Sequence, residues 1–171
     1  RVVARLLARD PAAEVSVLVR RGSLQHFERL SSKWGPRAKP LVGDLTEPGL
    51  GLGDDLGTAD HVVHCAAIYD MTAPEGIQRA ANVEGTRAVI DLTRRLGATL
   101  HHVSSIAVAG DFRGEYTEDD FDVGQYLPTP YHQTKFEAEG LVRAEHGLRT
   151  RIYRPAVVVG DSRTGEMDKA D

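Results

Sequence analysis

The chain has 171 residues, of which 41% are hydrophobic and 27% are charged, proportions typical of a soluble globular protein. Its net charge of −4, with interspersed signs and no Lys/Arg block, argues against a nucleic-acid or membrane-surface binder. No apolar run reaches the roughly 18 residues that span a bilayer, and no signal-peptide pattern opens the chain. The single cysteine, Cys65, rules out an internal disulfide framework and fits a reducing compartment, so we expect a cytoplasmic protein.

Hydrophobic periodicity predicts alternating helices and strands within one domain, residues 1–171. In chain order we expect a helix over 1–9, a strand over 14–20, a helix over 24–34, a strand over 39–44, a glycine-rich connection with at most one helical turn near 54–55, a strand over 61–67, a long helix over 74–96, a strand over 99–105, an acidic loop over 110–129, a helix over 131–147 and a strand over 149–155. This alternation predicts an α/β fold with a doubly wound parallel sheet and right-handed crossovers.

Tyr131 and Lys135 lie four residues apart in the last predicted helix, so they share one face of it. A lysine ammonium near a phenol favours the phenolate, which would let Tyr131 exchange a proton at neutral pH. Taken alone, the spacing is more simply a surface tyrosine above a surface lysine. The residues at the strand ends decide between these interpretations.

Ligands of open α/β sheets bind beyond the carboxyl ends of the strands, and several such ends here carry chemistry. Ser105 ends one strand and would hydrogen-bond a substrate carbonyl oxygen, whereas Ser104 points to the opposite face. Arg20 and Arg21 follow an earlier strand, where an acidic residue for a ribose 2′-hydroxyl is usual. Arginine suits a 2′-phosphate, which favours NADP over NAD; the alternative is a pair of solvated arginines.

Two further strand ends fit a nucleotide. Asp44 would accept a hydrogen bond from an adenine amino group, although aspartate is also common in turns. Ala66 and Ala67 are small enough for a flat cofactor to approach the backbone, although simple core packing also explains them.

Taken together, the motifs resemble those of the extended short-chain dehydrogenase/reductase (SDR) family, which has a Rossmann fold. They come in the family's order across nearly the whole chain: Gly43-Asp44-Leu45, His61 to Ala67, Asn82-Val83-Glu84-Gly85-Thr86, Val103-Ser104-Ser105 with Val108-Ala109-Gly110, Tyr131 to Lys135, and Arg154-Pro155. A lone Tyr-x-x-x-Lys is a weak signal, but six motifs in order are a strong one.

The resemblance implies a role for each matching residue. Tyr131 would be the general acid/base, Lys135 would bind the nicotinamide ribose and lower the tyrosine's pKa, Ser105 would orient the substrate, and Asn82 would hold a helix distortion and a proton-relaying water. The cofactor-binding residues would be Arg20, Arg21, Asp44, Leu45, Cys65, Ala66, Ala67, Ser104, Tyr131, Lys135, Pro155, Ala156, Val157 and Val158. Dimerisation through the two long helices is a further family expectation.

The resemblance also implies missing parts. The family's glycine-rich phosphate-binding loop should precede the first helix, and its substrate-binding part should follow the last strand. We therefore expect a fragment whose fold is incomplete at the N-terminus and lacks the C-terminal part.

Within the family, Pro128-Thr129-Pro130-Tyr131 and Gly160 to Glu166 are most similar to fatty acyl-CoA reductases and thioester-reductase domains. The leading prediction is an NADPH-dependent oxidoreductase acting on a carbonyl or acyl thioester. The alternatives are a sugar-nucleotide epimerase or dehydratase, a 3β-hydroxysteroid dehydrogenase-like enzyme, and a non-catalytic nucleotide-binding protein.

The seven histidines do not predict a metal site. His61 and His64 should face opposite sides of one strand, as should His101 and His102 of another, and no cysteine pair supports zinc. Cys65 is expected to be buried and inert beside small residues.

Overall fold

The computed structural model describes residues 1–68, 73–158, 160 and 163–165. It divides into two compact units, Arg1–Gly57 and Thr58–Asp171. Both contain the strand–helix alternation that the sequence predicts, and every strand pairing within them is parallel. No helix of the described residues is long and apolar enough to cross a membrane. Residues 161, 162 and 166 of the acyl-CoA-reductase-like motif lie outside the described residues.

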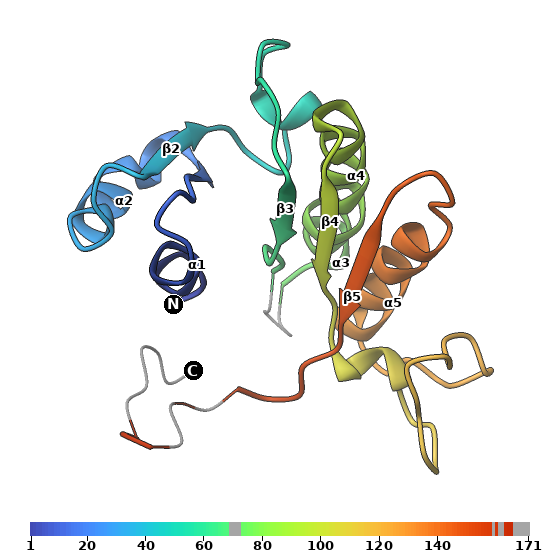
Figure 1. The fold of residues 1–171 in the computed structure, drawn as a ribbon. Coiled ribbons are helices and arrows are strands. Elements are labelled where there is room, and N and C mark those ends of the chain that lie inside the picture. The colour runs from blue at the N-terminus through green and yellow to red at the C-terminus, as the bar shows by residue number, and fades with distance from the viewer. Residues whose placement is uncertain (69–72, 159, 161–162, 166–171) are drawn as a thin grey trace. The chain divides into compact units, whose positions relative to one another are not determined.

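The first unit pairs two strands in parallel and packs helices against them (Figure 1). Its elements are α1 (Val2–Arg9), β1 (Val15–Val19), a short 3-10 turn (Arg21–Ser23), α2 (Leu24–Ser31), β2 (Ala38–Val42) and a second 3-10 turn (Pro48–Gly51). The second turn lies before Asp54, not at it, because proline and glycine at 48–51 favour a tight turn there.

Gly43 is required by close backbone packing at the end of β2. Leu50 is fully buried at a φ of 64°, and its carbonyl oxygen lies where a Cβ atom on residue 43 would be. The Leu50 carbonyl also accepts the Asp44 amide at 3.0 Å, which fixes the start of the chain segment after β2. The Gly-Asp-Leu motif therefore has a packing reason at its first position.

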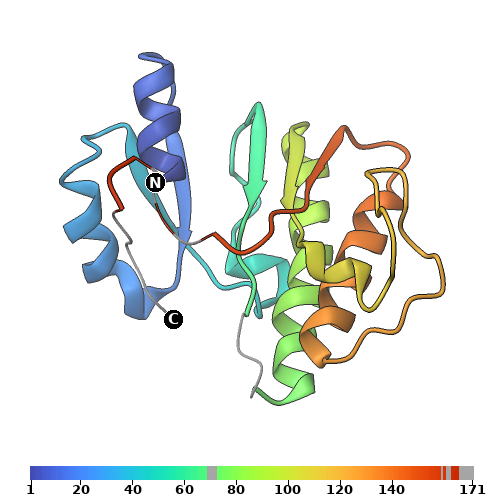
Figure 2. The same ribbon diagram turned by 90° about the horizontal axis from the view of Figure 1, so that it is seen from below.

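The second unit is a three-stranded parallel sheet in the order β3-β4-β5. Its elements are β3 (His61–His64), α3 (Glu75–Arg79), a π-helical turn (Ala80–Glu84), α4 (Gly85–Leu96), β4 (Thr99–Val103), a 3-10 turn (Ile106–Ala109), α5 (Pro130–Arg143) and β5 (Thr150–Tyr153). Helices α4 and α5 cover the same face of this sheet (Figure 2). Gly97 ends α4 in the left-handed region, as the sequence predicts.

Alternation along the strands decides which side chains enter the core of this unit. Leu100 and His102 of β4 are 0% and 1% exposed beneath the helices, and His64 of β3 is 5% exposed. His61 and His101 occupy the other face and hydrogen-bond each other at 3.1 Å. The prediction that each histidine pair is split between faces is confirmed.

One burial prediction is wrong. Cys65 is exposed, because β3 ends at His64 and the alternation places residue 65 on the side of His61 and Val63. The predicted helix that carries Tyr131 and Lys135 is also too long, since α5 ends at Arg143 and the prediction extends to Gly147.

Candidate functional site

The helix that carries Tyr131 and Lys135 has a capped N-terminus. Pro130 occupies its first turn, and the Thr129 hydroxyl accepts a hydrogen bond from the His132 amide. Tyr131 is therefore held in the first turn of α5, partly exposed. Lys135 follows one turn later and is only 4% exposed.

The Lys135 ammonium is held against the carboxyl end of β4. Its Nζ donates to the Val103 carbonyl at 2.8 Å. Burial lowers the lysine pKa to about 8, while the Glu139 carboxylate acts in the opposite direction. Lys135 is therefore a desolvated cation that is hydrogen-bonded to a strand-end carbonyl, in a position to interact with a ligand at that strand end.

Asn82 joins the end of β3 to the same helix. It lies, 2% exposed, in the π-helical turn between α3 and α4. Its Oδ1 accepts the Ile68 amide at 2.7 Å, and its Nδ2 donates to the Ile68 carbonyl at 3.3 Å and to the Thr134 hydroxyl at 3.1 Å. The helix distortion that the resemblance implies at Asn82 is present, and π-turns of this kind are frequent at functional sites.

Ser105 follows β4 with extended backbone and caps the 3-10 turn that comes next. Its Oγ accepts the Ala107 amide at 3.1 Å, so the hydroxyl proton is left to donate elsewhere. Ser104 points the other way, as predicted: its buried hydroxyl donates to Glu139 at 2.6 Å. The geometry therefore assigns the Ser104 side chain to the core, and its membership of a cofactor site stays a prediction.

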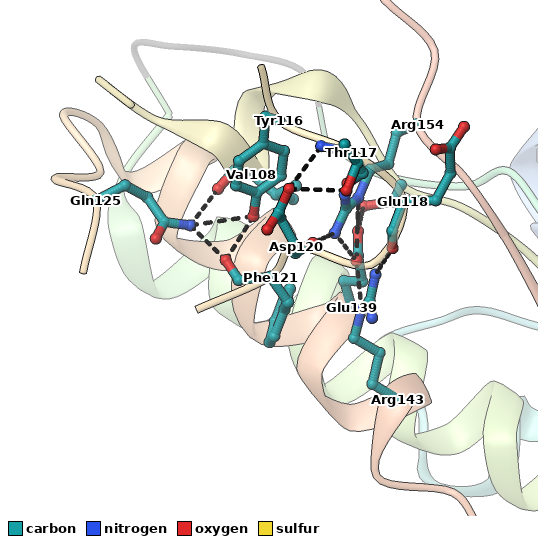
Figure 3. A network of polar contacts seen from close by, with 11 residues as sticks. Val108, Tyr116, Thr117, Glu118, Asp120, Phe121, Gln125, Glu139, Arg143 and Arg154 are labelled. Atoms are coloured by element: carbon teal, nitrogen blue, oxygen red, sulfur yellow. Dashed lines mark hydrogen bonds and ion pairs between the residues drawn. The ribbon is translucent and has the colours of Figure 1, made fainter. Parts of the chain in front are cut away.

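A buried ionic cluster surrounds the Glu139 carboxylate (Figure 3). Glu139 of α5 is 0% exposed, and its Oε1 accepts Arg143 Nε at 2.8 Å and Arg154 Nη2 at 2.7 Å. Burial alone would raise the pKa of Glu139, but the hydrogen bonds from Arg154, Ser104 and Arg143 lower it. The carboxylate is therefore ionised inside the unit.

Sequence reasoning missed Glu139 and Thr134 as members of this region. Thr134 lies three residues after Tyr131 and Glu139 lies four residues after Lys135, so helical spacing is a signal that could have found them. Two partners of Glu139, Ser104 and Arg154, directly follow β4 and β5, and that juxtaposition is not visible along the chain.

The first unit contains a pocket at the ends of its two strands. It has a volume of about 510 Å³ and is lined by Arg20, Arg21, Gly22, Ser23, Val42, Gly43, Asp44, Glu47 and Gly51. Asp44 accepts the Thr46 amide and hydroxyl at 2.9 and 2.8 Å, and these bonds, then the Arg20 charge, lower its pKa. The structure brings together three of the four residues predicted to bind the adenosine end of a cofactor, Arg20, Arg21 and Asp44.

The donor chemistry of this pocket fits a phosphorylated nucleotide. Two exposed arginines offer guanidinium donors, which suit a phosphate. Asp44 and Glu47 add acceptors suited to an amino or hydroxyl group. Leu45 follows Asp44 and is not among the pocket-lining residues.

The remaining predicted cofactor residues follow the strands of the second unit. Cys65, Ala66 and Ala67 are exposed after β3. Pro155 follows β5, and its carbonyl accepts the Ile106 amide at 3.1 Å, while Ala156, Val157 and Val158 are exposed beyond it. Their cofactor contacts stay predictions. No group of three or more potential metal ligands lies together among the described residues.

Comparison with known proteins identifies the family. A model of the NAD-binding family described as "Male sterility protein" matches residues 1–171. The terminal R domain from the myxalamid PKS-NRPS pathway superposes with a TM-score of 0.81 at 30% identity, over 95% of this chain and 47% of that one. The glycine betaine reductase ATRR of Emericella nidulans is 35% identical over 148 residues, which are 79% of this chain and 12% of that protein.

A relative with a different activity in its name also matches. The dTDP-glucose 4,6-dehydratase of Mycolicibacterium smegmatis is 35% identical over 124 residues, which are 68% of this chain and 37% of that protein. The chain thus spans less than half the length of each of these three proteins. It belongs to the "Male sterility protein" family of extended SDR proteins, and the prediction of a doubly wound, Rossmann-like α/β fold is confirmed.

Proposed function

We propose that this extended SDR chain is the nucleotide-binding and proton-transferring part of an NADPH-dependent reductase acting on an acyl thioester or aldehyde. The observation that carries the proposal is the convergence at the carboxyl end of β4. Lys135 is bonded to the last residue of that strand, Ser105 follows it, and Tyr131 lies one turn before Lys135. The names of two relatives, a terminal R domain and a reductase, support the choice of reductase.

NADPH, when bound, would supply the hydride. The chain's own residues would do the rest: Ser105 would donate a hydrogen bond to the carbonyl oxygen, and Tyr131 would deliver the proton that this oxygen takes up. Lys135, whose pKa is lowered by burial to about 8, would bind the ribose hydroxyls of the cofactor. In the first unit, Arg20 and Arg21 would bind the 2′-phosphate, and Asp44 would accept from adenine.

The test uses the full-length protein with NADPH or NADH and with acyl-CoA and aldehyde substrates. We expect Tyr131→Phe to lower turnover by about 10²-fold or more, since general acid catalysis contributes that much. Equal turnover by this variant would refute the proton-transfer role of Tyr131.

The cofactor preference is tested separately. Replacing Arg20 and Arg21 together by alanine should raise KM for NADPH and leave KM for NADH nearly unchanged. Arg29→Ala is the matched control, because Arg29 is an exposed arginine of α2 outside the arginine-lined pocket. Preference of the unmodified protein for NADH would overturn the 2′-phosphate assignment.

The second candidate is a sugar-nucleotide dehydratase or epimerase, which the match to the dTDP-glucose dehydratase favours. Such an enzyme would convert a nucleotide sugar with no net consumption of NAD(P)H. Incubation with dTDP-glucose and product analysis distinguish it from the reductase.

A further inference from the structure

Glu139 connects every element that carries the proposed catalytic groups. On α5 it lies four residues after Lys135 and eight after Tyr131, so all three share one face of the helix. Ser104 of its cluster directly precedes Ser105, and Arg154 directly precedes Pro155. Two partners of Glu139, Ser104 and Arg154, are thus each directly followed in the chain by a predicted site residue.

The two arginines extend the connection to the loop that precedes α5 (Figure 3). Arg154 donates to the carbonyls of Thr117 and Asp120 at 2.9 and 2.6 Å, and its guanidinium lies 5.0 Å from the centre of the Tyr116 ring. Arg143 donates to the Glu118 carbonyl at 2.9 Å. The segment 116–121 is therefore bound through its carbonyls to two arginines that share the Glu139 carboxylate.

A second set of contacts joins the same segment to the residues after it and to α5. Gln125 Nε2 donates to the carbonyls of Val108 and Phe121, both at 2.7 Å. The Phe121 ring stacks on Phe136 of α5 with centroids 4.2 Å apart. The position of the loop relative to α5 is thus defined both by these contacts and by the two arginines that bind Glu139.

Stability alone is a poor explanation for such a cluster. Burying a carboxylate and guanidinium groups carries a desolvation penalty that their attraction often only offsets, and apolar packing of similar volume is commonly as stable. What a directional buried network provides is a single relative position of the elements that it joins.

We propose that Glu139 is a positioning residue, whose carboxylate sets the distance between the Ser105 end of β4 and the Tyr131–Lys135 face of α5 and holds segment 116–121 beside them. Glu139 acts through Ser104, Arg143 and Arg154 and touches no reacting atom. The inference rests on the proposed reductase function. Its physical basis is that a displacement of about 1 Å between reacting groups lowers rates by about 100-fold.

The test compares Glu139→Gln with two controls in the full-length protein. Glu139→Gln keeps the shape but removes the charge, so Arg143 and Arg154 lose their counterion. Thr93→Val removes a buried hydroxyl that bonds within α4, and serves as a control for general destabilisation. Glu145→Gln removes an exposed ion pair with Arg94 at 2.7 Å, and should leave activity unchanged.

Two readouts separate positioning from folding. In single-turnover hydride transfer, Glu139→Gln should be slowed by about 100-fold, while its Kd for NADPH changes by less than about threefold. In hydrogen exchange without substrate or cofactor, the amides of 103–110 and 116–121 should lose protection, but those of α4 should not. The proposal would be overturned if Glu139→Gln transfers hydride at a rate within twofold of the unmodified protein. It would also be overturned if its loss of rate is no larger than that of Thr93→Val, provided that the two variants have the same Tm.

Failure of the reductase function itself gives a different pattern. If the unmodified protein consumes no NADPH with any carbonyl substrate, the proposed function fails, and hydrogen exchange still tests the positioning role. If the amides of 103–110 and 116–121 are as protected in Glu139→Gln as in the unmodified protein, that result alone would refute the positioning role.

Discussion

His102 is a buried polar residue that destabilises the fold, and replacing it should stabilise the protein. Its ring is 1% exposed, and neither ring nitrogen has a hydrogen-bond partner among the described residues. An unsatisfied buried polar group costs about 1–3 kcal/mol. His102→Leu has a similar volume and removes that cost, so we expect the free energy of unfolding at pH 7.5 to rise by about 1–3 kcal/mol.

The same substitution should reduce acid sensitivity. Burial, then the charges of His64 and Lys135, lower the His102 pKa to about 3, and burial, then the charge of Lys135, lowers that of His64 to about 4, from an ordinary 6.5. Because the unfolded chain protonates near pH 6.5 and the folded one does not, the stability is fully present above pH 6.5. It falls as the pH drops from there toward 4 and 3. At pH 5 each histidine then costs about 2 kcal/mol.

Urea unfolding between pH 7.5 and pH 5 measures both effects. The pair should cost the unmodified chain about 4 kcal/mol over this range, and His102→Leu should halve that loss. His61→Gln, on the exposed face of the same sheet, is the control for replacing a histidine outside the core. A His102→Leu chain that is less stable at pH 7.5, or as acid-sensitive as the parent, would refute the reasoning.

Three further predictions follow from the same structure. Lys135, with a pKa of about 8, should show a reductive-methylation NMR titration midpoint near pH 8, and a midpoint above pH 10 would contradict its desolvation. Gly43→Ala should lower the free energy of unfolding by about 2 kcal/mol or more, because its Cβ meets the buried Leu50 carbonyl. Gly22→Ala, with open space around it, should change little in the same denaturation experiment. Asn82→Ala should lower the free energy of unfolding by about 2–4 kcal/mol, because it leaves the Ile68 amide and carbonyl without their partner. Thr134→Val should lower it by only about 1 kcal/mol. Equal losses in the two variants would refute the view that Asn82 joins the end of β3 to α5.

The local signals in the sequence were sufficient to predict the order of helices and strands and the fold class. Hydrophobic periodicity, prolines at helix starts and Gly97 at a helix end act within a few residues, so helices and strands could be placed from the chain alone. Boundaries were less accurate: α5 ends four residues before the predicted Gly147, because the final turn depends on capping rather than on periodicity.

The sequence also indicated the candidate site, because parallel strands bring their carboxyl ends to one edge. Tyr131 and Lys135 are one helical turn apart by spacing alone, and the alternation along β4 separates Ser104 from Ser105. These relations need no knowledge of tertiary contacts. Cys65 shows the limit, since its burial depended on where β3 ends, and the prediction was wrong.

Only the tertiary structure could show what lies behind that edge. Two partners of Glu139, Ser104 and Arg154, are 35 residues before it and 15 residues after it along the chain, and those of Asn82 are 14 and 52 residues away. No local pattern encodes such pairs, because a glutamate or an asparagine in a helix has the same sequence signature whether exposed or buried. The sequence by itself determined the elements and the proposed reacting groups, whereas the long-range packing decided which polar side chains are buried to hold them in place.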